Sequence, residues 1–111
     1  MSEIFFRLLI GHAAADFWAQ SDTMAKGKNR HRKTEPPPGA KYQPTWMYWL
    51  LAHALIHGGA VWMATGSVGA AISETLAHAA IDFGKCENWY GIHTDQALHI
   101  ACKLAWLLVW V

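Results

Sequence analysis

Apolar residues dominate four long stretches of this chain, and a polar segment separates the first stretch from the other three. None of the four shows the strict alternation of apolar and polar residues that a half-buried β-strand requires. Ser2 suits a helix start, while Gly66 and Gly84 suit helix ends because glycine readily adopts the left-handed conformation found there. The pattern predicts an all-α protein of one domain, residues 1–111, with helices over about residues 3–20, 45–65, 67–83 and 94–111.

The residues between the first two predicted helices, 21–44, form a basic and proline-rich segment. It holds six of the nine Lys and Arg residues and the consecutive prolines Pro36, Pro37 and Pro38. Like charges and prolines cannot bury enough apolar surface to pack, so this segment is predicted to be a loop.

The composition favours a membrane protein. Hydrophobic residues make up 53% of the chain, charged residues make up 15%, and seven residues are Trp. Each predicted helix has roughly the 17–25 residues that are needed to cross a hydrocarbon core. The last one is apolar almost all the way round its final two turns, where a water-exposed bundle would carry charges. The sequence therefore predicts a four-helix transmembrane bundle.

The basic segment gives the predicted bundle an orientation, because short loops rich in Lys and Arg stay in the cytoplasm. With four spans, both termini then lie on the non-cytoplasmic side. The net charge of +1 argues against a protein built to coat nucleic acid. Gly58, Gly59, Gly66 and Gly69 would permit close helix contacts and hence a homo-oligomer. In the lipid bilayer, the basic side chains expected to contact anionic headgroups are Lys26, Lys28, Arg30, Arg32 and Lys33.

Each predicted helix carries one pair of ionisable residues spaced four positions apart. Residues i and i+4 lie on one face of an α-helix, so each pair forms a clamp one turn tall. In the predicted orientation one member of each pair lies near the cytoplasmic face and the other lies one turn deeper, which gives two layers about 6 Å apart. The pairs are His12 with Asp16, His53 with His57, His78 with Asp82, and Asp95 with His99.

Four clamps that meet at the same depth predict a metal site. Ionisable groups at such depth are costly unless they pair, line a cavity or hold an ion. Imidazole and carboxylate ligands together suit Zn, Mn, Fe or Ni, and eight ligands suffice for one ion or two. A proton or ion relay and a purely structural polar network are alternatives for the same residues. The eight candidate ligands are His12, Asp16, His53, His57, His78, Asp82, Asp95 and His99.

Asp16 and Asp82 are also candidate general bases. Both lie near predicted helix C-termini, where the helix dipole disfavours an anion, so a cation partner would explain them. Glu74 and Lys103 are predicted to form a buried ion pair, with Arg7 as a further candidate member. The residues that continue the polar faces and are expected to support the ligands are Gln20, Gln96, Glu74 and Lys103.

These motifs resemble those of a known family. The run from Gly11 to Ala25, together with His53 and the segments His78–Lys85 and Asp95–His99, is similar to the "domain of unknown function 3307" family of small bacterial and phage membrane proteins. The resemblance covers all four predicted helices. It implies a compact, multi-pass helical protein of the bacterial inner (cytoplasmic) membrane, and it supplies no reaction.

Together these features predict a metal-dependent hydrolase that acts at the cytoplasmic membrane interface on a lipid or phosphoester-type substrate. A metal there would lower the pKa of bound water and polarise the scissile group, with a carboxylate as general base. Two other functions fit the same sequence. One is an intramembrane relay or transporter component for protons or divalent ions, and the other is a small membrane-anchored accessory protein that docks through its basic loop.

Overall fold

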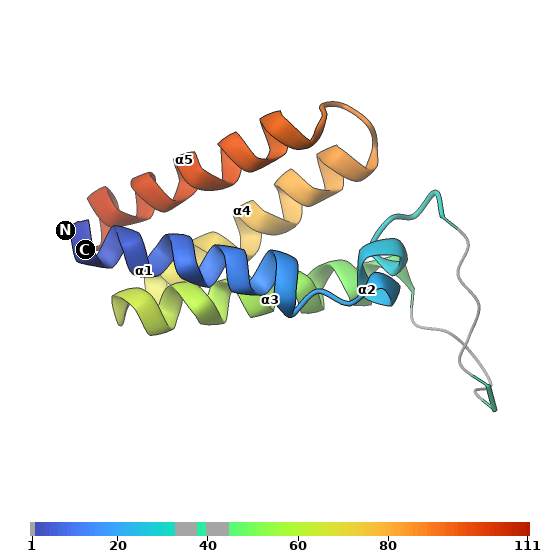
Figure 1. Ribbon diagram of the computed structural model, residues 1–111, viewed down its shortest axis with the longest axis horizontal. Helices are drawn as coiled ribbons and strands as arrows, with labels where there is room; N and C mark the ends of the chain where they lie inside the picture. Colours follow the sequence, from blue (N-terminus) through green and yellow to red (C-terminus); the bar gives the residue numbers. More distant parts are fainter. Residues whose placement is uncertain (1, 33–37, 40–44) are drawn as a thin grey trace.

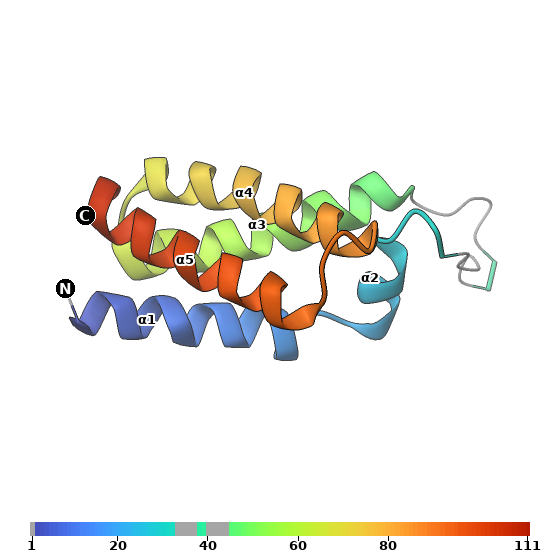
Figure 2. The same ribbon diagram turned by 90° about the horizontal axis from the view of Figure 1, so that it is seen from above.

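The computed structural model of the protein describes residues 2–32, 38–39 and 45–111. Four long helical segments run side by side, and both ends of the chain lie at the same end of the bundle (Figure 1). α1 packs on α3 and α5, and α4 packs on the same two helices (Figure 2). The prediction of an all-helical chain agrees with these residues. The elements are α1 (Ser2–Ala13), η1 (Ala14–Trp18), α2 (Asp22–Gly27), α3 (Trp46–Thr65), α4 (Val68–Cys86) and α5 (Ile92–Trp110).

Local signals explain the tight connection between α3 and α4. Gly66 ends α3 with a φ of 71°, a left-handed conformation that glycine adopts without steric cost. The Ser67 hydroxyl then accepts a hydrogen bond of 3.1 Å from the N–H of Ala70 and caps the start of α4. The two helices therefore form an antiparallel hairpin that holds their polar faces side by side.

The first helix differs from the single continuous helix expected over residues 3–20. After Ala13 the chain widens into the π-helix η1, in which the N–H of Ala19 donates to the carbonyl oxygen of Ala14, five residues earlier, at 2.8 Å. A π-helical turn is rare and is frequently found at functional sites. The spacing of apolar residues that predicts an α-helix does not reveal it. Asp16 lies in the middle of this turn, so η1 decides where its carboxylate points.

α2 lies inside the segment 21–44, where a loop was expected. The Ser21 hydroxyl caps it by accepting a hydrogen bond of 3.1 Å from a backbone N–H three residues on. Gly27 packs so closely on α3 that a Cβ there would lie 2.5 Å from the ring of Trp49. α2 is therefore held against the start of α3, and this contact fixes the position of Lys28.

α4 runs past Gly84, where a helix end was expected, and continues to Cys86. Gly84 has a packing role instead, since a Cβ there would lie 2.6 Å from the hydroxyl oxygen of Tyr90. This hydroxyl donates to the carbonyl oxygen of Ile81 and closes the turn between α4 and α5. The turn sets how the polar faces of α4 and α5 meet.

The prediction of a transmembrane bundle is wrong. Across residues 2–32, 38–39 and 45–111, no helix combines the length and the apolar character needed to cross a bilayer. The 12 residues of α1 extend about 18 Å, well short of a hydrocarbon core of about 30 Å. Histidines and small residues in α3, and charged residues in α4 and α5, lower the hydropathy of the longer helices. The predicted orientation, with both termini on the non-cytoplasmic side, and the multi-pass location in the bacterial inner membrane are wrong for the same reason.

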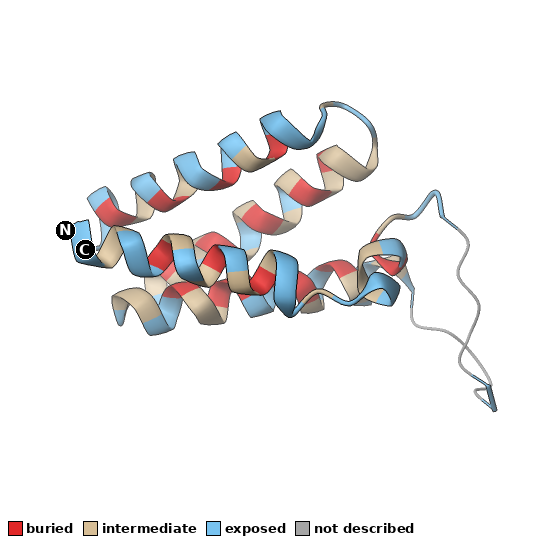
Figure 3. Cartoon of the chain, viewed as in Figure 1, coloured by how far each residue is buried: buried red, intermediate tan, exposed pale blue. Residues whose placement is uncertain are grey.

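The interior of the bundle is more polar than apolar. The buried faces of the long helices point toward one another (Figure 3). Among the described residues seven apolar residues are buried, against ten polar or charged residues. Leu8, Val61 and Ala70 form a small apolar core, while large apolar side chains such as Leu76 and Leu108 are exposed. The polar interior is therefore the feature that needs a physical explanation.

Replacing Gly58 with Ala is expected to destabilise the protein by about 1–3 kcal/mol, because overpacking displaces neighbouring groups. Gly58 lies where α3 meets α4, and a Cβ there would lie 2.1 Å from the hydroxyl of Thr75 and 2.9 Å from the carbonyl oxygen of Ala71. Gly59→Ala is the control, because a Cβ there meets no described atom within 4 Å and Ala favours a helix over Gly by about 0.5–1 kcal/mol. Urea unfolding followed by circular dichroism measures both variants, and equal stabilities would contradict this packing.

Candidate metal centre

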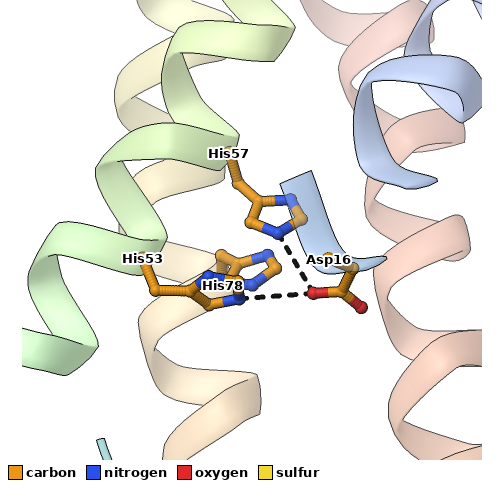
Figure 4. A group of neighbouring side chains, drawn as sticks. All are labelled: Asp16, His53, His57 and His78. Carbon is orange, nitrogen blue, oxygen red and sulfur yellow. Dashed lines mark hydrogen bonds and ion pairs between the residues drawn. The ribbon is translucent and has the colours of Figure 1, made fainter. Parts of the chain in front are cut away.

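Three imidazoles and one carboxylate converge between α3, α4 and η1. His53 and His57 lie one turn apart on α3, His78 lies on α4, and Asp16 reaches toward them from η1 (Figure 4). Asp16 Oδ1 lies 3.2 Å from His53 Nε2 and 3.1 Å from His57 Nε2. One ligand atom from each of the four residues lies within 4.8 Å of the other three. Ligand atoms about 2.0–2.2 Å from a single ion lie at most about 4.4 Å apart, so the two Asp16 distances fit an ion as they stand, and any wider separation in the group would have to contract on binding.

Four nitrogens of this group make no hydrogen bond to any described residue: Nδ1 and Nε2 of His53, Nδ1 of His57 and Nε2 of His78. The two Nε2 atoms lie 3.2–3.5 Å from carboxylate oxygens, and the side chains of His53 and His78 are fully buried, with 0% exposure. A buried polar atom that is left unsatisfied costs about 1–3 kcal/mol. A cation bound to both Nε2 atoms would remove this cost, so the two atoms indicate a ligand.

Glu74 determines which nitrogen of His78 faces the group. Its Oε1 accepts hydrogen bonds from His78 Nδ1 at 3.2 Å and from Lys103 Nζ at 2.6 Å, and its Oε2 accepts one from Trp106 Nε1 at 2.6 Å. Burial raises the pKa of Glu74, but His78 and Lys103 outweigh burial and hold this pKa below its usual range. The carboxylate is therefore ionised, and His78 Nδ1 carries the proton. His78 Nε2 is then the nitrogen that faces the other candidate ligands, as in carboxylate–histidine–metal arrangements.

A second group of ligand atoms lies where α4 meets α5. His99 Nε2 is 3.3 Å from Asp82 Oδ1 and 3.3 Å from Asp95 Oδ1, and the three residues offer ligand atoms within 4.8 Å of one another. The other oxygen of Asp82, Oδ2, lies 3.4 Å from His53 Nε2 and 3.5 Å from His78 Nε2. Asp82 therefore joins the two groups.

His12 lies beside the ligands without belonging to either group. Its ring centroid is 5.2 Å from that of His57, and the rings of His57 and His78 stack at 3.6 Å, so the deeper imidazoles do lie together. His12 Nε2, however, lies 2.9 Å from Gln96 Oε1, while Gln96 Nε2 donates to Asp16 Oδ2 at 2.9 Å. His12 therefore supports Asp16 both through Gln96 and directly, since His12 Nε2 lies 3.6 Å from Asp16 Oδ2.

The electrostatics of the centre keep most of the ligands in the form that binds metal. Burial raises the pKa of Asp16, but the contacts of its carboxylate with His53, His57 and the amide of Gln96 outweigh burial and hold this pKa below its usual range. The pKa of Asp82 is also lowered, because His78 and His99 outweigh the effect of burial. Burial lowers the pKa of His57 to about 3, which makes its imidazole neutral at pH 7. Ionised carboxylates and neutral imidazoles are the species that ligate metals.

His99 behaves differently from the other histidines. Burial lowers its pKa, but the carboxylates of Asp82 and Asp95 outweigh burial and raise this pKa to about 9. Without a metal, the imidazole of His99 is therefore protonated at pH 7 and serves as the cation between these two carboxylates. A metal ion there would take over that role and displace the proton.

The other residues that were predicted to support the ligands differ in whether they reach the buried polar network. The ion pair between Glu74 and Lys103 is present, and both side chains are 1% exposed. Gln20 reaches only the backbone of its neighbour, since its Nε2 donates to the carbonyl oxygen of Asp16 at 3.3 Å. Arg7 forms an exposed ion pair with Glu3 at 2.7 Å and lies outside the buried network.

Lys28 is the site residue that sequence reasoning missed. It was expected at lipid headgroups, yet it is 7% exposed, and its Nζ lies 2.7 Å from Asp82 Oδ2. No spacing rule connects residues that are 54 positions apart. Trp106 was likewise not among the predicted site residues, and its indole N–H donates a hydrogen bond to Glu74 Oε2.

Two of the other basic residues expected at headgroups form ion pairs with carboxylates. Lys26 pairs with Asp22 at 2.9 Å, and Arg30 pairs with Glu87. Arg32 is exposed, and Lys33 lies outside the described residues.

A sequence model of the family described as "Protein of unknown function (DUF3307)" matches residues 4–111. This match confirms the resemblance that the polar motifs predicted. The description gives neither a reaction nor a location, so it does not bear on the expectation of small bacterial and phage membrane proteins. No curated protein and no solved structure matches the chain.

The metal-free protein is expected to lose stability as the pH rises from about 6.5 to about 9. Folding raises the pKa of His99, so its stabilising charge is fully present below the unfolded value and is lost as the pH rises through the folded value. His99→Gln should flatten this decline, and the exposed His93→Gln serves as the control on the same helix. Urea unfolding in the presence of a chelator measures the decline at each pH. An equally steep decline in His99→Gln would show that this imidazole is not the cause.

Proposed function

Because the chain belongs to the family described as "Protein of unknown function (DUF3307)", whose description carries no reaction, we propose a function from the site itself. The protein binds one divalent transition-metal ion between Asp16, His53, His57 and His78 and uses it to hydrolyse an ester or phosphoester bond. The observation that carries this proposal is that His53 Nε2 and His78 Nε2 are fully buried, make no hydrogen bond to any described residue and belong to a group whose ligand atoms, that of Asp16 included, lie within 4.8 Å of one another.

The donor set indicates which metals fit. Three imidazole nitrogens and one carboxylate oxygen suit Zn, Mn, Fe or Ni. Ca²⁺ and Mg²⁺ prefer shells made mainly of oxygen ligands, which this group does not offer. A bound ion of the first kind would lower the pKa of a water molecule and polarise the oxygen of the scissile bond.

Asp82 is the better placed of the two candidate general bases. Asp16 is used as a ligand, because its Oδ1 lies between the nitrogens of His53 and His57. Asp82 Oδ2 lies beside the same ion position, 3.4 Å and 3.5 Å from the nearest imidazole nitrogens, without being needed as the fourth ligand. Its carboxylate can therefore accept the proton of an attacking water. The ammonium of Lys28, 2.7 Å from this oxygen, adds a positive charge where negative charge develops on the substrate.

An apolar groove beside η1 supports a substrate with an apolar chain. The groove encloses about 740 Å³ between α1, η1 and α3, and Ala15, Trp18, Ile56 and Met63 are among its lining residues. Ala15 is the neighbour of Asp16, whose side chain is 11% exposed and is the most exposed of the four ligands. An ester of a long acyl chain would place its chain in the groove and its ester group near Asp16. This arrangement fits a lipid-type substrate better than a small polar one.

A proton relay is the second candidate function. A line of short contacts leads from Lys28 through Asp82, His78 and Glu74 to Lys103, with steps of 2.7, 3.5, 3.2 and 2.6 Å. Titratable groups connected in this way can pass protons. A relay needs no bound metal, so the metal content of the protein separates the two functions.

The purified protein is expected to bind one zinc ion per chain, and His57→Ala and His78→Ala are each expected to lose it. Removal of one imidazole leaves too few strong ligands for a stable tetrahedral site. His93→Ala is the control, because His93 is an exposed histidine on α5. Elemental analysis after dialysis measures the metal content, with circular dichroism as the check on folding. A metal-free wild type, or full zinc content in both folded variants, would contradict the metal centre.

Asp82→Asn is expected to keep the zinc and to lower kcat by about 10²- to 10⁴-fold, the usual contribution of a general base. p-Nitrophenyl esters of increasing acyl chain length, with p-nitrophenyl phosphate in parallel, are suitable substrates. Asp22→Asn is the control, because Asp22 is 81% exposed and lies on α2. Absence of turnover by the zinc-loaded wild type on both substrate types would rule out the hydrolase, and undiminished turnover by Asp82→Asn would rule out this base.

A further inference from the structure

Lys28 is the one buried cation of the described residues that comes from outside the four long helices. Its side chain is 7% exposed, and its ammonium lies 2.7 Å from Asp82 Oδ2. The contacts on either side hold it in place: Gly27 packs on Trp49, and Arg30 forms a two-pronged ion pair with Glu87. A long, flexible side chain that is fixed in this way is a permanent part of the site.

The position beyond Asp82 has the features of a second cation site. Asp82 Oδ1, Asp95 Oδ1 and His99 Nε2 surround one point, with the nitrogen 3.3 Å from each oxygen. Asp95 Oδ1 is buried and makes no hydrogen bond to any described residue, and the residue as a whole is 1% exposed. Apart from its 3.3 Å contact with His99, this buried oxygen has no partner among the described residues, which indicates a place where a cation can bind.

A pair of metal ions would need Asp82 as a bridge. Metal ions in dinuclear hydrolytic sites lie about 3.5–4 Å apart and share ligands. Asp82 is the residue that faces both groups here, with Oδ2 beside His53 and His78 and Oδ1 beside His99. Lys28 occupies Oδ2, which is the oxygen that a bridging carboxylate would give to the first ion.

We propose that Lys28 takes the place of a second metal ion: it keeps the centre mononuclear, and its removal opens the position between Asp82, Asp95 and His99 to a second divalent cation. The proposal deepens the proposed function and rests on it, because it presupposes an ion held by Asp16, His53, His57 and His78. The native fold thus supplies one metal ion and one fixed ammonium where related chemistry elsewhere uses two metals.

The test is the zinc stoichiometry of the purified full chain, measured by elemental analysis and by calorimetric titration with zinc alone. The wild type is expected to hold one ion, and Lys28→Met, which keeps the length of the side chain without its charge, is expected to hold two. Lys28→Arg retains the charge and should hold one. Lys26→Met is the control from the same segment and should also hold one.

A double variant locates the second ion. Adding Asp95→Asn to Lys28→Met should return the content from two zinc ions to one. Lys28→Gln, whose amide can still donate to Asp82, is measured in parallel and should also hold two ions, so the test remains decisive if the methionine variant folds poorly. Circular dichroism checks the folding of each variant.

The outcomes separate this inference from the function on which it rests. If the wild-type protein held no zinc, the proposed metal centre itself would be contradicted. A wild type that holds one ion, with Lys28→Met and Lys28→Gln also holding one, would leave the centre intact and overturn the role of Lys28. If the wild-type protein already held two ions, the proposed role of Lys28 would also be wrong, because its ammonium would not exclude a second ion.

Discussion

Burial of several carboxylates in one small space is the constraint on which this structure depends. Asp16, Asp82 and Asp95 lie in one connected cluster, and like charges about 4 Å apart repel by roughly 4 kcal/mol at the effective dielectric of a protein. Lys28 and the protonated His99 supply positive charge in this cluster, while other imidazole nitrogens, among them His53 Nε2 and His78 Nε2, make no hydrogen bond to any described residue. The divalent ion that we propose between those two nitrogens would supply the remaining counter-charge.

The supporting interactions follow from this constraint. Glu74 orients His78, and Lys103 and the Trp106 indole keep Glu74 ionised and fixed. Gln96 connects His12 to Asp16. Each of these side chains is positioned by a rigid helix, so the ligand atoms need little reorganisation to bind an ion, which is what a preorganised metal site requires. The close contact between α3 and α4 at Gly58 helps to hold His57 of α3 beside His78 of α4.

Much of the site could be predicted from the sequence, because spacing of four residues fixes which side chains share a helix face. This rule identified His53 with His57 and His78 with Asp82, and it also foresaw the buried pair of Glu74 and Lys103. The rule is local, and it fails where the chain leaves regular geometry or where partners are distant. It did not foresee the π-helical turn around Asp16, the short helix α2, or the insertion of Lys28 into the centre.

The error about membrane spans has a related cause. Predicted helices were treated as continuous and as apolar on average, whereas α1 ends at Ala13 and the polar residues of the longer helices lower their hydropathy. The same histidines and carboxylates that predicted a metal site thus count against a membrane span. The polarity of the interior was therefore weighed too lightly in the prediction of topology.

The most direct measurement is the anomalous scattering of zinc in a crystal of the wild-type protein. The account predicts one strong peak about 2.0–2.2 Å from Asp16 Oδ1 and from the Nε2 atoms of His53, His57 and His78. A bundle without any peak in its interior, or with zinc bound only at surface groups such as His31 and Glu87, would contradict it.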